Sequence, residues 1–115
     1  TSDYFPTVLD LAGVDLAAGP NPIDGISLKE IVAGTAKERP APIAFESRKQ
    51  LALIGNRYKI ISQDAGETFA LYDLVKDPGE QDDVSASMPE MLREMRKELA
   101  AWRASCQQSL AGADY

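Results

Sequence analysis

The hydrophobic positions in residues 1–13 recur with the period of a helix. A stripe of apolar residues shares one helical face: Phe5, Val8, Leu9 and Ala12. Asp3 is suited to cap the N-terminus of this helix, Pro6 is tolerated in a first turn, and Gly13 is a good stop. A helix this short and this apolar packs either against a larger protein body or against the core of its own chain.

A second, shorter helix is predicted after the turn-rich residues 14–26. Ser27 and Glu30 have the spacing of a capping box, and Gly34 marks the end of the helix. Three apolar residues share one face of it: Leu28, Ile31 and Val32. Residues 35–42 are polar and contain proline, which predicts a linker.

From residue 43 onward the hydrophobic period changes from 3.6 to 2, which is typical of β-strands. The alternating segments are 43–46, 51–54, 57–62 and 69–72. Gly55-Asn56 lies between two of them and is a good signal for a two-residue hairpin turn. We therefore expect a small antiparallel sheet of about four strands.

The last strong pattern predicts a long helix. Ser87 and Glu90 repeat the capping-box spacing, and Pro89 falls in the first turn, where proline is tolerated. An apolar stripe follows at helical spacing: Met88, Met91, Leu92, Met95, Leu99 and Trp102. This stripe is interpreted as the face that covers the sheet.

The expected fold is α+β, with a small four-stranded antiparallel sheet packed against a long C-terminal helix and preceded by two short helices. Four parts are predicted: a helical segment, a linker, the sheet with its helix, and a tail, at 1–34, 35–42, 43–105 and 106–115.

Composition narrows the function classes. The 115 residues suit one domain with a modest core, and the net charge of −6 argues against nucleic acid or an anionic membrane as partner. The sequence has no histidine, which removes the commonest general base and the commonest metal ligand. Cys106 is the single cysteine, so no internal disulfide can form. The chain opens with Thr1 instead of Met, so the lack of a visible targeting signal carries no information.

Several phrases of the sequence resemble the C-terminal end of the formylglycine-dependent sulfatases of the alkaline phosphatase superfamily. Asp3–Gly13 is similar to a D-x-x-P-T-x-x-D-L-A-G helix, and Asp24–Leu28 to a D-G-x-S-L turn. Asn56–Ile61 is similar to an R-Y-K strand, and Leu71–Leu74 followed by Asp77–Glu80 to L-Y-D-L and D-P-x-E. Their order and spacing over about 100 residues make the combination specific.

This resemblance implies a parent enzyme that hydrolyses sulfate monoesters. In the family, a Cys or Ser in C/S-x-P-S-R becomes formylglycine, and a divalent cation, usually calcium, is held by Asp and Asn residues. Cys106 is followed by Gln107 and Gln108, which does not match. We therefore assign no catalytic residue, no metal ligand and no cofactor here, and expect the chain alone to be inactive. The family also implies a periplasmic or extracellular location.

One group of residues is a candidate for substrate binding. Arg48 and Lys49 follow the first predicted strand and could bind an anionic substrate, because Arg offers a bidentate fork and Lys a point charge. The alternative interpretation is a solvated turn. Arg57 and Lys59 are interpreted as a solvent-facing strand edge, and the acidic residues 73–83 as a loop that caps the last helix instead of a calcium site.

The expected partners are the missing N-terminal catalytic domain, which the helical segment 1–34 would join in the parent, and, for the parent, a sulfated small molecule or glycan. Self-association through the exposed first helix is a further expectation. Two rival functions remain open: a stand-alone interaction module, or the end of a related phosphonate or phosphate ester hydrolase.

Overall fold

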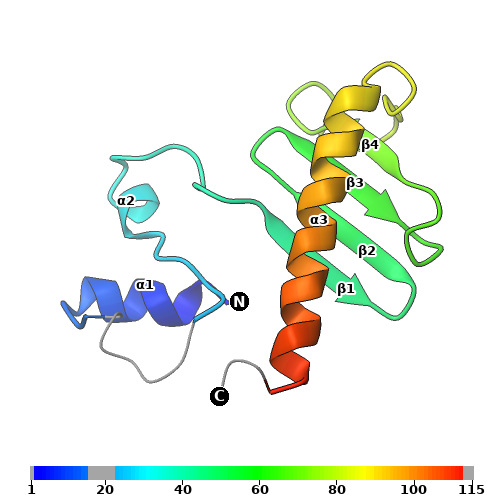
Figure 1. Cartoon of the computed structure of the whole chain (residues 1–115). Helices are drawn as coiled ribbons and strands as arrows, with labels where there is room; N and C mark the ends of the chain where they lie inside the picture. Colours follow the sequence, from blue (N-terminus) through cyan, green and yellow to red (C-terminus); the bar gives the residue numbers. More distant parts are fainter. Residues whose placement is uncertain (1, 16–22, 113–115) are drawn as a thin grey trace. The chain divides into compact units, whose positions relative to one another are not determined.

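The structure is a computed structural model that describes residues 2–15 and 23–112 (Figure 1). It contains two compact units, Thr1–Arg39 with Ser109–Tyr115, and Pro40–Gln108. Residues 16–22 of the turn-rich segment 14–26 lie outside the described residues.

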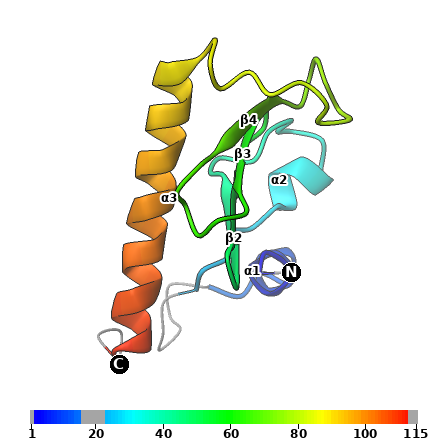
Figure 2. The same ribbon diagram turned by 90° about the vertical axis from the view of Figure 1, so that its right-hand side faces the viewer.

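The larger unit is a four-stranded antiparallel sheet with strand order β1-β2-β3-β4. Its strands are β1 (Ile43–Ser47), β2 (Gln50–Ile54), β3 (Tyr58–Ser62) and β4 (Ala70–Asp73). Helix α3 (Pro89–Leu110) lies along one face of this sheet, as the edge-on view in Figure 2 shows. The α+β class and the sheet–helix architecture expected from the sequence are therefore confirmed.

The core of this unit lies between the sheet and α3. Alternate residues of the strands point to one face, and these are apolar and almost fully buried: Leu51, Leu53, Ile60 and Leu71. From α3, Met95 and Leu99 complete the cluster, while the rest of the predicted helical stripe packs around it. The stripe therefore covers the sheet as expected. Burial of this apolar surface is the main term that stabilises the unit.

The hairpin between β2 and β3 differs from its prediction by one residue. Ile54 pairs with Lys59, and the backbone N–H of Gly55 donates to the carbonyl of Tyr58 at 2.9 Å. The two central residues of the turn are therefore Asn56 and Arg57. Glycine sits at the edge of the turn and not at its centre, because the register follows the buried alternation of the strands.

Both predicted capping boxes are wrong. Helix α2 (Lys29–Val32) has Leu28 at its N-cap position, and the Ser27 hydroxyl donates to the Asp10 carboxylate at 2.6 Å. The Ser87 hydroxyl donates backwards to the carbonyl of Val84 at 2.9 Å. The Ser27 hydroxyl also accepts the backbone N–H of Lys29 at 3.2 Å, but neither serine occupies the N-cap position of its helix. Helix α3 continues to Leu110, past the start of the predicted tail at residue 106.

The smaller unit holds α1 (Tyr4–Leu11) against the loop that leads into α2. Asp3 is the N-cap residue as expected, but its carboxylate makes no cap bond. It accepts the backbone N–H of Ile26 at 2.9 Å and two guanidinium nitrogens of Arg39, each at 3.0 Å. Three donors from distant positions thus converge on one buried carboxylate, which fixes where the chain returns to the helix.

Two further polar residues of α1 extend this contact. The Thr7 hydroxyl accepts the backbone N–H of Leu28 at 2.9 Å. Asp10 accepts the Ser27 hydroxyl and the Lys29 ammonium, the latter at 3.0 Å. Asp3, Thr7 and Asp10 are spaced i, i+4 and i+7, so one polar face of the helix binds the loop.

Gly25 allows the loop to approach closely. A Cβ atom built at this position would lie 2.0 Å from the backbone carbonyl oxygen of Ser2, which no side chain can accommodate. The Asp, Thr, Gly and Ser residues of the first two family-like phrases therefore join a helix to a loop.

Candidate functional site

The candidate substrate-binding residues Arg48 and Lys49 form the tip of the β1–β2 hairpin. Ser47 pairs with Gln50, so Arg48 and Lys49 are the two central residues of the turn. Arg48 has a φ of 56°, a left-handed conformation that glycine adopts more easily than arginine. A large cationic side chain thus occupies a position where backbone geometry alone favours glycine, and such strain is often found at functional sites.

The turn borders an open hollow lined by polar side chains: Ser47, Arg48, Lys49, Gln50 and Gln63. Among the residues that the structure describes, neither the Arg48 guanidinium nor the Lys49 ammonium has a carboxylate partner. Two neighbouring unpaired cations, with a hydroxyl and two amides beside them, are suited to binding an oxyanion.

The neighbouring loop supports the backbone of this turn. The carbonyl of Lys49 accepts the backbone N–H of Ala65 at 2.8 Å. Asp64 braces the loop by accepting the Thr68 hydroxyl at 2.5 Å and the Ser62 hydroxyl at 2.7 Å. The hydroxyl and backbone N–H of Thr68 hold the pKa of Asp64 far below its usual range, so this carboxylate stays ionised at all ordinary pH values.

An ion pair anchors β1 just before the turn. Arg103 of α3 donates from Nη2 and Nε to the Glu46 carboxylate at 2.8 and 3.1 Å. The Glu46 carboxylate raises the pKa of Arg103, which remains a cation. This bidentate geometry ties the end of β1 to the helix and limits how far the hairpin tip can move.

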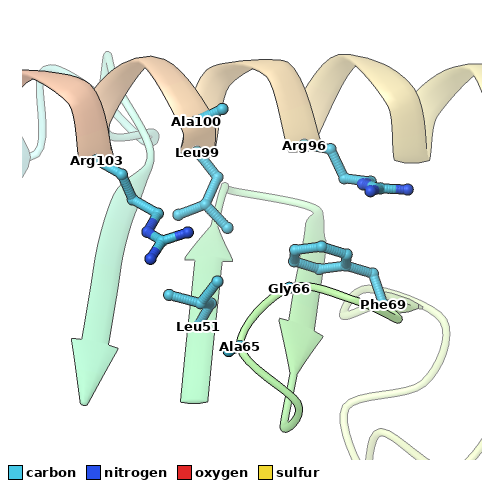
Figure 3. A pocket seen from close by; sticks show the side chains of 8 residues that line it. All are labelled: Leu51, Ala65, Gly66, Phe69, Arg96, Leu99, Ala100 and Arg103. Carbon is cyan, nitrogen blue, oxygen red and sulfur yellow. The ribbon is translucent and has the colours of Figure 1, made fainter. Parts of the chain in front are cut away.

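A second hollow, of about 150 Å³, lies between α3 and the sheet (Figure 3). Leu99 and Leu51 point toward one another in it, and the Arg96 guanidinium lies 4.9 Å from the centre of the Phe69 ring. Both guanidinium groups that line this hollow already have a partner. That of Arg96 stacks on the Phe69 ring, and that of Arg103 pairs with the Glu46 carboxylate. It is therefore a weaker candidate for anion binding than the hairpin tip.

The prediction that Arg57 and Lys59 form a solvent-facing edge is right for the exposure of Arg57, whose side chain is 50% exposed, and wrong for Lys59. Arg57 donates to the Asp73 carboxylate at 2.9 Å, and this pairing lowers the pKa of Asp73. The Lys59 ammonium lies 2.5 Å from Glu80, and its side chain is only 17% exposed. These pairs join the β2–β3 turn and β3 to β4 and to the loop that follows it, and all four residues belong to the third and fourth family-like phrases.

The acidic segment is organised by backbone hydrogen bonds. The Asp77 carboxylate accepts the N–H groups of Gln81 and Asp82, and Asp83 accepts those of Leu71 and Ser85. Within residues 2–15 and 23–112, no group of three or more His, Cys, Asp or Glu is placed to hold a metal ion.

The described part of the chain also offers no place for a formylglycine. Cys106 is a half-buried free thiol in α3. Its following residues do not form the required motif, and the Asp77 and Asp83 carboxylates are bonded to backbone N–H groups. The residues present therefore do not fit a formylglycine–calcium centre. No helix in the described residues has the length and apolar character needed to cross a membrane.

The described residues form an α+β fold with a candidate anion-binding turn. No protein-family model and no curated protein matches the sequence. Solved structures do match it. A 2-O glycosaminoglycan sulfatase is 27% identical over 96% of this chain and 26% of its own, with a TM-score of 0.68.

Two other structures show the same fold. One is a Bacteroides thetaiotaomicron 6S-sulfatase described in the metabolism of multiple glycosaminoglycans, with 21% identity, a TM-score of 0.73, and coverage of 89% of this chain and 24% of its own. The other is the phosphonate monoester hydrolase of Agrobacterium radiobacter, with 25% identity, a TM-score of 0.57, and coverage of 90% and 24%. The resemblance to the sulfatases is therefore confirmed, and this chain spans about a quarter of the length of each of these three chains.

Two features of the molecule escaped the sequence reasoning. The Asp3–Arg39 pair joins residues far apart in the chain, although the i, i+4, i+7 spacing of Asp3, Thr7 and Asp10 already marked a polar helical face. The contact between Arg96 and Phe69 had no local signal, because it depends on how α3 lies over the loop before β4.

Proposed function

We propose that this chain is the C-terminal part of a sulfatase whose whole protein hydrolyses sulfate monoesters. The observation that carries this proposal is the likeness to the 2-O glycosaminoglycan sulfatase, which extends over 96% of the chain at 27% identity. In this proposal the parent enzyme is periplasmic or extracellular and acts on a sulfated small molecule or glycan.

In this proposal the present chain and the remaining part of the parent enzyme have different roles. The remaining part would supply the formylglycine, the divalent cation and the groups that move protons, since the residues described here do not fit them. The formylglycine hydrate and the metal would provide the nucleophile and the charge stabilisation of the reaction. The present chain would be structural and would border the substrate cleft.

Arg48 and Lys49 are proposed to bind a negatively charged group of the substrate at that border. Support comes from their unpaired side chains, from the polar hollow beside them and from the braced turn that carries them. The planar guanidinium would hold two oxygens of a sulfate or carboxylate, and the ammonium would add a point charge. Both residues would position the substrate without touching the reacting atoms.

The proposed function makes a direct prediction about activity. The 115-residue chain should hydrolyse no sulfate ester, whereas the full reading frame that contains it should hydrolyse a chromogenic or saccharide sulfate. The measurement is sulfate release by each protein at equal concentration. Activity of the short chain that disappears in Cys106→Ser would contradict the proposal, and so would a full reading frame that lacks a C-x-P-S-R or S-x-P-S-R motif.

A substitution tests the role of the hairpin tip. In the full-length enzyme, Arg48→Gly should raise KM for an anionic substrate by roughly tenfold, as expected from the loss of a charged hydrogen-bonding group. The turn itself should tolerate the change, because glycine adopts the positive φ of 56° readily. The control is Lys97→Ala, because Lys97 is an exposed cation on α3. Alanine is used there in place of glycine because the position lies within a helix. Equal KM values for Arg48→Gly and wild type, with both proteins folded, would sink the role of Arg48.

A phosphonate or phosphate ester hydrolase is the second candidate, because the Agrobacterium radiobacter phosphonate monoester hydrolase also matches 90% of the chain. The two are distinguished by assaying the full-length enzyme on matched aryl sulfate and aryl phosphonate esters. Preference for the phosphonate would select this alternative.

A further inference from the structure

The helix α1 presents its apolar side chains to solvent. Among its residues, Tyr4 is 74% exposed, Phe5 60%, Val8 62% and Leu11 56%. The buried positions are Asp3, at the N-cap, and Pro6. The face that makes contacts within the described residues of this unit is therefore the polar one, and the apolar side chains stay more than half exposed.

This arrangement is the reverse of an ordinary surface helix, which buries its apolar stripe and exposes its polar one. The polar face is fully used, since Asp3, Thr7 and Asp10 all bind the loop that leads into α2. Rotation of the helix to hide the apolar side chains would break these hydrogen bonds. The helix is thus held by its polar face in a position that leaves the apolar face available to another protein segment.

We propose that the apolar face of α1, made of Tyr4, Phe5, Val8 and Leu11, docks against the remaining part of the parent hydrolase. This inference depends on the proposed function in one respect only, which is that these residues belong to a longer chain. The chain spans 26% of the 2-O glycosaminoglycan sulfatase that it matches, so a protein of that kind has about three quarters of its length left to form such a cover.

A second copy of this chain is the less favoured occupant. One face of an eight-residue helix is smaller than the ~800 Å² that each partner buries in a stable dimer. A covalently linked segment does not lose the translational and rotational freedom that two separate molecules lose on association, so a smaller area is enough.

The test compares one substitution in two proteins. Val8→Asp is introduced into the 115-residue chain and into the full-length protein, with Val32→Asp as the matched control. Val32 is 69% exposed, lies in α2 of the same unit, and receives the same chemical change. Thermal unfolding of all variants is followed by calorimetry or circular dichroism.

The expected result is selective. Val8→Asp should lower the Tm of the full-length protein by roughly 3 °C or more, because a charge would enter a buried interface. The same change should leave the Tm of the short chain within about 1 °C, as for other exposed positions. Val32→Asp should shift neither protein by more than this.

Other outcomes overturn the docking proposal. Equal, small Tm shifts for Val8→Asp and Val32→Asp in the full-length protein would show that the face stays exposed. A large loss in the short chain would show that the face packs within the chain. A dimer of the short chain that Val8→Asp dissociates, seen by sedimentation equilibrium, would assign the face to a second copy. A reading frame without further chain would also overturn it. Because the Tm readout does not depend on activity, failure of the sulfatase assignment would leave this result interpretable.

Discussion

Replacing Ile60 with alanine is expected to lower the free energy of unfolding of the sheet–helix unit by about 3 kcal/mol, within the usual range of 2–5 kcal/mol for such truncations. Ile60 is 0% exposed and lies at the middle of β3, paired with Leu53 on one side and Leu71 on the other. Loss of the side chain removes buried apolar surface and leaves a cavity that the neighbouring strands cannot close.

The loss caused by Ile60→Ala should be a large fraction of the total free energy of unfolding of this unit. This unit has a single small core, and domains of its size are stabilised by only about 5 kcal/mol in total. Urea unfolding followed by the fluorescence of Trp102, which packs at the edge of the core, measures the change. The control is Val75→Ala, where the side chain is 67% exposed and the expected change is below ~0.5 kcal/mol. A loss under ~1 kcal/mol for Ile60→Ala would mean that the core repacks easily.

Replacing Asp3 with alanine is expected to release α1 from its loop. The carboxylate accepts the Ile26 N–H and two nitrogens of Arg39, and the side chains of Asp3 and Arg39 are 11% and 15% exposed. Removal of one partner of such a pair leaves a poorly solvated guanidinium and an unpaired amide, which costs about 3 kcal/mol. A unit of this size should then open locally without unfolding the sheet.

Amide hydrogen exchange at Ile26 measures the release of α1 from its loop. The Ile26 amide should exchange about 100-fold faster in Asp3→Ala, while the amides of β3 keep their wild-type rates. Arg39→Lys should give an intermediate result, since lysine keeps the charge but loses the bidentate geometry. Unchanged protection of Ile26 in Asp3→Ala would contradict a structural role for this carboxylate.

The same carboxylate makes the contact sensitive to acid. The hydrogen bonds from Arg39 hold the pKa of Asp3 below its ordinary value of 3.8. Because the folded-state pKa is lowered, the contribution of Asp3 to stability is fully present above about pH 4 and declines as the pH falls through the lower folded-state pKa. Protection of the Ile26 amide should therefore be constant near neutrality and decrease in strong acid.

The hydrophobic pattern was sufficient to predict the elements of this protein. The alternation in residues 43–72 and the stripe from Met88 to Trp102 predicted four strands and a covering helix, and both are present with their apolar faces together. These predictions succeeded because periods of 2 and 3.6 are local consequences of backbone geometry, and burial follows from them. The family-like phrases likewise lie along the chain and need no tertiary information to be recognised.

Tertiary structure alone decided how the polar residues are used. Ser27 has the spacing of a helix cap, yet it binds Asp10, and Asp3 leaves its own helix uncapped to bind Arg39. Local spacing cannot predict such contacts, because a serine or carboxylate bonds whichever partner the fold brings near. The same holds for the anion-binding candidate. The sequence placed Arg48 and Lys49 in a turn, but only the structure shows the strained backbone, the bracing loop and two cations without carboxylate partners among the described residues.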